Sequence, residues 1–135
     1  MANHFSLHGG VIVPDDPGAR GIIQLLTHKM RNRVALAYYP HAYDIDLGDP
    51  HDFMIVLSLA DFERVVRFYD LKRERIPLMV HIDTPDELIT IDYARLYPGI
   101  DVLPVPQAPL GAAPDTTLEL NLFGKILKRL EVESD

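Results

Sequence analysis

Five consecutive apolar residues in the middle of the chain, at positions 53–57, constrain the fold more than any other feature. The run reads Phe-Met-Ile-Val-Leu and lacks the alternation of apolar and polar residues that marks a strand with one face in water. A short continuous run of this kind is typical of a strand that is covered on both faces. We therefore expect residues 53–57 to form the central strand of a sheet.

The neighbouring segments supply further strands and helices. Apolar stretches typical of strands lie at 5–13, 34–39 and 76–83. One helix is expected from Asp16 to about Asn32, and a second begins after the capping residue Ser58. The resulting order, β-α-β-β-α-β over residues 5–83, is that of a ferredoxin-like split βαβ arrangement. We predict an α+β protein whose antiparallel sheet carries both helices on one face.

Two segments are less regular than this pattern. Gly9-Gly10 lies inside the first expected strand, which indicates a bulge, a bend or two short pieces. Residues 85–97 fit both a helix that begins with a capping box and a strand that follows a hairpin turn. The spacing of Ile89, Tyr93 and Leu96 gives a slight preference for the helix.

The end of the chain divides into a linker and a helix. Residues 104–115 are rich in proline, alanine and glycine, so we expect an extended, semi-rigid linker there. The run Thr-Thr-Leu-Glu at 116–119 matches a capping box and begins a final helix that continues to about Glu131. We expect one domain, in which residues 1–103 form the core and residues 116–135 pack on that core or on a partner.

Potential ligands and acid–base groups concentrate between His41 and Asp52. This stretch holds two histidines and four aspartates, and it lies between two expected strands. In the predicted topology its residues meet Asp15, Asp16 and the basic run 73–75 at one end of the sheet. The predicted binding loop comprises Asp15, Asp16, His41, Asp44, Asp46, Asp49, His51 and Asp52.

Imidazole and carboxylate groups that converge in this way are able to hold a divalent cation. We would choose His41, Asp46 and His51 as its first ligands. The opposing interpretation is a solvated turn, because the run Leu-Gly-Asp-Pro at 47–50 supplies ordinary turn chemistry unaided. No cofactor other than such a metal is indicated.

Composition excludes several classes of function. The chain has 135 residues, a formal net charge of −7 and no cysteine. An acidic protein of this kind is not expected to bind nucleic acid, and no thiol chemistry or disulfide is available to it. We also expect no membrane segment, and the absence of a signal-like N-terminus makes the cytoplasm the expected compartment. The sequence contains neither a Gly-x-Ser-x-Gly motif nor a phosphate-binding glycine loop.

The final helix carries apolar residues over slightly more than half of its circumference. A helix that packs on one surface needs a narrower stripe, so the excess predicts contact with a second copy of the chain. The predicted interface residues of this homodimer are Leu120, Phe123, Leu127 and Leu130. The alternatives are a helix that lies deep in its own domain, or a strand from Leu118 to Leu122 followed by a short helix.

Two functions remain open from the sequence alone. The first is a small acidic, non-enzymatic binding protein that self-associates and docks a protein or small ligand at the loop end of its sheet. The second is a metal-dependent hydrolase or isomerase that uses the segment from His41 to Asp52. We favour the first because no catalytic signature accompanies the His/Asp segment.

Overall fold

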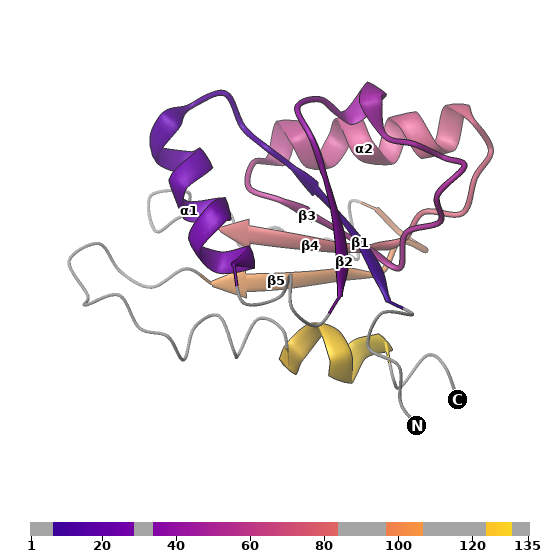
Figure 1. Cartoon of the computed structure of the whole chain (residues 1–135). Coiled ribbons are helices and arrows are strands. Elements are labelled where there is room, and N and C mark those ends of the chain that lie inside the picture. The colour runs from indigo at the N-terminus through magenta and orange to yellow at the C-terminus, as the bar shows by residue number, and fades with distance from the viewer. Residues whose placement is uncertain (1–6, 29–33, 84–96, 107–123, 131–135) are drawn as a thin grey trace.

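The computed structural model describes residues 7–28, 34–83, 97–106 and 124–130 (Figure 1). These residues form one five-stranded sheet that is parallel throughout, with its strands in the order β2-β1-β3-β4-β5. The strands are β1 (His8–Ile12), β2 (Ala35–Tyr39), β3 (Phe53–Val56), β4 (Leu78–Asp83) and β5 (Val102–Pro106).

The predicted antiparallel, ferredoxin-like sheet is therefore wrong. The expectation for residues 53–57 is confirmed, because β3 lies in the middle of the sheet with β1 on one side and β4 on the other. Its four residues are all buried, as is Leu57 immediately after it. The continuous apolar run thus correctly indicated a strand that is covered on both faces. Strands of parallel sheets usually have this character.

The direction of β3 is determined by the connection from Pro40 to Asp52. A hairpin needs only a few residues, whereas about a dozen allow the chain to cross a sheet face and start a parallel strand. Here the chain leaves the carboxyl end of β2, forms the short 3-10 helix η3 (Ala42–Asp44) and returns to the amino end of the sheet. The order of elements was read correctly, but it does not by itself distinguish these two routes.

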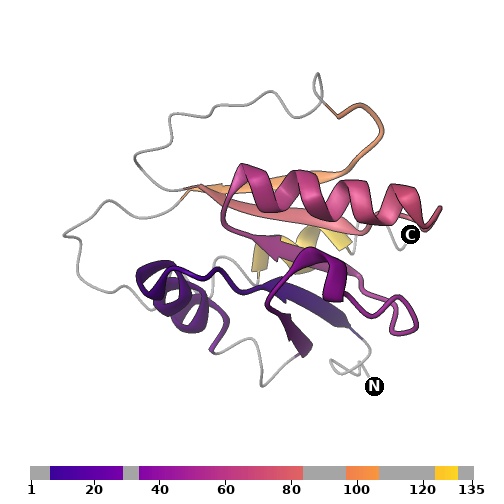
Figure 2. The same ribbon diagram turned by 90° about the horizontal axis from the view of Figure 1, so that it is seen from above.

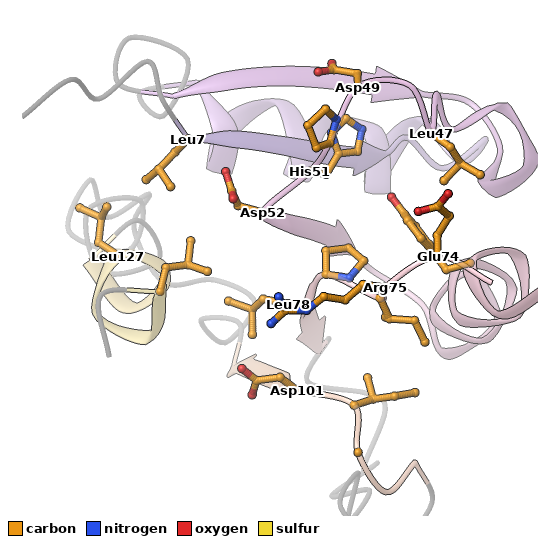
Figure 3. Close-up of a pocket in the computed structure, with 17 residues that line it drawn as sticks. Leu7, Leu47, Asp49, His51, Asp52, Glu74, Arg75, Leu78, Asp101 and Leu127 are labelled. Atoms are coloured by element: carbon orange, nitrogen blue, oxygen red, sulfur yellow. The ribbon is translucent and has the colours of Figure 1, made fainter. Parts of the chain in front are cut away.

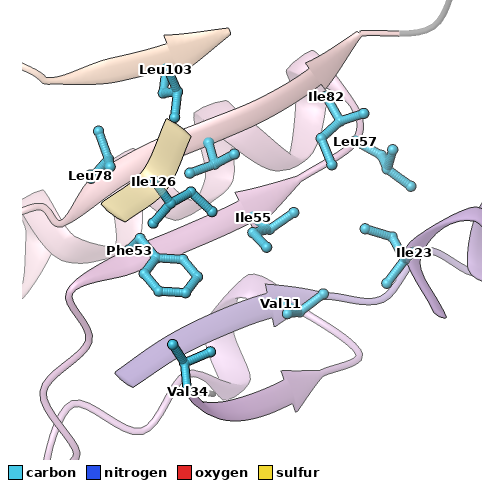
Figure 4. Packing of buried hydrophobic residues seen from close by; sticks show 11 residues of the cluster. Val11, Ile23, Val34, Phe53, Ile55, Leu57, Leu78, Ile82, Leu103 and Ile126 are labelled. Atoms are coloured by element: carbon cyan, nitrogen blue, oxygen red, sulfur yellow. The ribbon is translucent and has the colours of Figure 1, made fainter. Parts of the chain in front are cut away.

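The helices cover both faces of the sheet, not one face as expected (Figure 2). Helix α1 (Pro17–Thr27) and the helix at residues 124–130 lie on one face, where Ile23 and Ile126 join one hydrophobic cluster (Figure 4). Helix α2 (Leu59–Leu71) and η3 lie on the other face and share the second cluster. The connection from β1 through α1 leads to β2 on one side of β1, whereas the connection from β3 through α2 leads to β4 on the opposite side. Because both crossovers are right-handed, α1 and α2 lie on opposite faces of the sheet.

Gly9 and Gly10 belong to a regular strand, because β1 pairs continuously with β2 and with β3. The predicted bulge or bend is therefore wrong. A methyl group at Gly9 would overlap the ring of Phe53 on one face, and one at Gly10 would overlap the Met54 side chain on the other. The two glycines thus allow large side chains of β3 to lie directly over β1.

Several predictions fall wholly or partly on residues that the structure does not describe. These are the helix or strand at 85–97, most of the linker at 104–115 and the first part of the C-terminal helix. The described part of that helix spans residues 124–130. In the described ranges, no helix is both long and apolar enough to cross a membrane.

Candidate ligand-binding cavity

A cavity of about 1000 Å³ opens at the amino end of the sheet (Figure 3). Its walls come from the chain before β1, the end of the β2–β3 connection, the turn between α2 and β4, the segment before β5 and the 124–130 helix. The lining residues are Leu7, Leu47, Asp49, Pro50, His51, Asp52, Tyr69, Glu74, Arg75, Ile76, Pro77, Leu78, Gly99, Ile100, Asp101, Leu127 and Leu130.

Parallel topology explains why these segments meet. Every strand begins at the same edge of a parallel sheet, so the chain segments that enter β1, β3, β4 and β5 come together there. Hydrogen bonds of Asp52, which precedes β3, connect the segments that enter β1, β3 and β4. Its backbone N–H donates to the His8 carbonyl (2.7 Å), its Oδ2 accepts from the His8 N–H (2.8 Å), and its carbonyl accepts from the Leu78 N–H (3.2 Å).

His51 lies in the cavity wall and is held by a tyrosine. Its Nε2 is 2.8 Å from the Tyr39 hydroxyl, and Nδ1 is buried without a hydrogen-bond partner among the residues that the structure describes. Burial raises the pKa of Tyr39, an effect that a hydrogen bond from the Asp46 backbone partly offsets. The phenol therefore keeps its proton throughout the neutral range and is able to donate it to the imidazole.

The charged lining residues are mostly acidic. Four carboxylates, those of Asp49, Asp52, Glu74 and Asp101, accompany a single guanidinium, that of Arg75, among the described walls. Asp101 is neutralised by an ion pair with Arg129, which also attaches the 124–130 helix to the start of β5. Asp49 lies 3.8 Å from His8 Nδ1, and both side chains are partly exposed.

The predicted binding loop is divided between the two ends of the sheet. Asp49, His51 and Asp52 line the cavity at the amino end, but Asp15 and Asp16 follow β1 at its carboxyl end. The length of β1 alone separates the two groups by about 13 Å. The predicted convergence is right for Arg75 of the basic run 73–75, which lines the same cavity, but wrong for Asp15 and Asp16, because their placement depended on the antiparallel topology. Asp16 instead caps α1, with its Oδ2 accepting from the Ala19 N–H at 2.9 Å.

The three expected metal ligands each have a local partner. His41 Nδ1 accepts from the Tyr43 N–H and its ring stacks on Tyr43, while Asp46 Oδ1 accepts from the Gly48 N–H at 2.9 Å. His51 is bonded to Tyr39. Within the described residues, no group of three or more histidine or acidic side chains is arranged to hold a metal ion. Asp44 is exposed in η3 and contributes no cavity wall.

The predicted interface residues are described only in part. Leu127 and Leu130 pack, partly buried, against the hydrophobic cluster on the α1 face, and they also line the cavity. Leu120 and Phe123 lie outside the described residues. The packing of Leu127 and Leu130 agrees with the alternative of a helix that lies deep in its own domain, while their place in a dimer interface and the oligomeric state itself stay predictions.

Sequence reasoning missed several residues that build the cavity. Leu7 and Asp101 carry no local signal of a binding site, and only the parallel strand order brings them beside the His/Asp segment. His81, a further residue that the predicted site did not include, is fully buried in β4, with its ring 6.0 Å from that of Phe62. Comparisons of the chain with protein-family models, curated proteins and solved structures found no match.

Proposed function

We propose that this chain is a non-enzymatic binding domain whose cavity at the amino end of the sheet accepts a ligand with a cationic group on an apolar body. The observation that carries the proposal is the combination of aliphatic walls and unneutralised carboxylates in one cavity. A free amine and a lysine or arginine side chain of a protein partner share this chemistry.

The aliphatic part of the lining supports an apolar body. Seven lining residues are leucine or isoleucine, and they come from five separate chain segments: Leu7, Leu47, Ile76, Leu78, Ile100, Leu127 and Leu130. A volume of about 1000 Å³ is at the upper end of ordinary small-ligand sites. An alkyl chain placed against such walls would gain roughly 0.8 kcal/mol for each buried CH₂ group.

The acidic part of the lining supports a cationic group. With Asp101 paired to Arg129, the carboxylates of Asp49, Asp52 and Glu74 outweigh the single guanidinium of Arg75. In Figure 3 the Asp52 and Glu74 side chains extend from different walls, so their negative potential adds within the cavity. A concave site with charges of one sign raises the local concentration of oppositely charged ligands.

Self-association is a second part of this proposal. A homodimer agrees with the small size of the chain, and Leu127 and Leu130, which pack partly buried against the cluster on the α1 face, leave the position of its interface open. The alternative function, a metal-dependent hydrolase or isomerase, lacks comparable support, because His41, Asp46 and His51 are each bonded elsewhere.

The test compares three probes of matched length: n-hexylamine, n-hexanol and hexanoate. Binding is followed by shifts in the backbone amide resonances of Leu7, Asp52 and Leu78, which line the cavity. We expect saturable shifts that are strongest with n-hexylamine and weakest with hexanoate. A short Leu-Lys-Leu peptide, blocked at both ends, tests whether a protein segment is also accepted.

Glu74→Gln provides the matched variant, with Asp70→Asn as its control, since Asp70 is exposed on α2 and does not line the cavity. The first change should weaken amine binding roughly two- to fivefold, and the second should leave it unchanged. Equal shifts with amine and carboxylate, or shifts remote from the cavity, would contradict the proposal.

A further inference from the structure

The two edges of the sheet differ in their ability to accept another strand. Among the described strands, β2 and β5 lie at the edges, and each pairs with a single neighbour. An edge strand presents unpaired N–H and C=O groups to which another strand can bond. Which residues face outward follows from the hydrogen bonds that each edge makes inward.

The outer edge of β5 is blocked by proline. Met79 N–H donates to the Asp101 carbonyl, so residues 101, 103 and 105 direct their backbone groups toward β4. The outward positions of the strand are therefore 102, 104 and 106. Pro104 and Pro106 occupy two of these, and proline has no N–H to offer.

The outer edge of β2 has no such protection. Ala35 N–H donates to the Leu7 carbonyl, and Tyr39 O accepts from the Val13 N–H, so residues 35, 37 and 39 bond inward. Leu36 and Tyr38 consequently direct both their N–H and C=O groups away from the sheet. The strand reads Ala-Leu-Ala-Tyr-Tyr, without charge or proline, and no described element lies beyond it in Figures 1 and 2.

We propose that a second copy of this chain pairs with β2 in antiparallel orientation, about a two-fold axis at Ala37. This register sets Leu36 opposite Tyr38 of the second copy, and Tyr38 opposite its Leu36. Both are hydrogen-bonded positions of an antiparallel ladder, so all four outward N–H groups of the two strands find carbonyl acceptors. Two five-stranded sheets would become one continuous sheet.

The side chains are self-complementary in the same register. Leu36 and Tyr38 lie on the α1 face, where the Tyr38 hydroxyl is 3.0 Å from Thr27 Oγ1 and the side chain is 37% exposed. Leucine opposite tyrosine is a favourable aliphatic–aromatic cross-strand pair. On the other face Ala37 meets Ala37 of the second copy, and two methyl groups fit at a closely spaced, non-hydrogen-bonded position.

The inference rests on the self-association in the proposed function and assigns a surface to it.

Ala37→Glu and Ala37→Lys are the decisive variants, because each places two like charges directly opposite one another at the two-fold axis. We expect sedimentation equilibrium to show a dimer whose dissociation constant rises roughly five- to tenfold in either variant. An equimolar mixture of the two variants should recover the lost affinity through Glu–Lys pairs. Ala60→Glu and Ala60→Lys, at an exposed position of α2, are the matched controls and should leave the dimer unchanged.

Hydrogen exchange of the unmodified protein provides a measurement that needs no variant. The amide protons of Leu36 and Tyr38 should become better protected as protein concentration rises, whereas those of Ala35 and Ala37 should not change. A dimer that persists equally in both Ala37 variants, or a mixture that recovers nothing, would overturn the β2 assignment but leave self-association standing. A monomer at millimolar concentration would overturn both, while amine binding in the cavity would stand independently.

Discussion

The Tyr39 hydroxyl lies 2.8 Å from Nε2 of His51 and so joins the two ends of the connection between β2 and β3. Tyr39 is the last residue of β2, and His51 lies two positions before β3. The imidazole passes close to Gly10, where a β-carbon would be 3.0 Å from His51 Cδ2. This contact helps hold the connection across the sheet face and fixes His51 in the wall of the cavity.

Removal of the phenolic hydroxyl tests the importance of this contact for stability. Tyr39→Phe leaves the imidazole nitrogen without its partner, so we expect the free energy of unfolding to fall by about 1–2 kcal/mol. Urea unfolding at neutral pH measures the change. Tyr43→Phe is the control, because the Tyr43 side chain is half exposed, and its loss of a hydroxyl should cost less than about 0.5 kcal/mol. Equal effects of the two changes would contradict a structural role for the Tyr39–His51 bond.

Buried tyrosines should make the protein sensitive to alkali. Burial raises the pKa of Tyr69 to about 12, from an ordinary value of 10.0. Between these values the unfolded chain has lost the phenolic proton while the folded chain retains it, so stability falls as pH rises. Tyr69 alone should contribute a loss of up to roughly 2–3 kcal/mol across this interval.

Urea unfolding of the wild type and of Tyr69→Phe between pH 9 and pH 11.5 checks this expectation. The variant should lose less stability over the interval, because it has no phenol to ionise. Tyr43→Phe, which removes an exposed hydroxyl, should follow the wild type. Parallel pH dependences for the wild type and Tyr69→Phe would show that ionisation of Tyr69 does not drive the alkaline loss.

Two glycines, Gly9 in β1 and Gly21 in α1, give predictions of opposite sign for substitution by alanine. Gly9→Ala forces a methyl group into the Phe53 ring and should destabilise the protein by about 1–3 kcal/mol. Gly21→Ala, in α1, meets no atom within 4 Å and should stabilise it by about 0.5–1 kcal/mol. Thermal unfolding of both variants measures the difference, and a neutral Gly9→Ala would show that Phe53 moves aside without cost.

The sequence predicted the existence of most elements, but not the direction in which one of them runs. Local signals such as the Ser58 cap and the apolar run at 53–57 correctly indicated α2 and the central β3. Strand direction depends on how the chain between Pro40 and Asp52 crosses the sheet, which no local periodicity records. Its length was the available signal, since about a dozen residues suit a crossover better than a hairpin.

The candidate site was predictable to the same degree. The composition of the stretch from His41 to Asp52 directed attention to this connection, and three of its residues, Asp49, His51 and Asp52, line the candidate cavity. Arg75, from the basic run expected beside this segment, also lines the cavity. Leu7 and Asp101 could not be found, because only the parallel order of the strands brings them there. Residue type alone also could not show that His41 and Asp46 serve turns of their own backbone.

The helix at residues 124–130 gives a final prediction, which separates a role in the core from a role in a dimer. Ile126 is 1% exposed and belongs to the cluster that contains Phe53 and Leu78 on the α1 face. Ile126→Ala removes buried methyl and methylene groups and should destabilise the protein by about 2–5 kcal/mol. Because these contacts lie within one chain, the loss should be the same at micromolar and at tenfold higher protein concentration.

Arg129→Gln is the control. It breaks the half-exposed ion pair with Asp101 and should lower the free energy of unfolding by no more than about 1 kcal/mol. Urea unfolding at both concentrations measures these values. A loss on Ile126→Ala that changes with concentration would place the helix in an interface between two copies instead of in its own core.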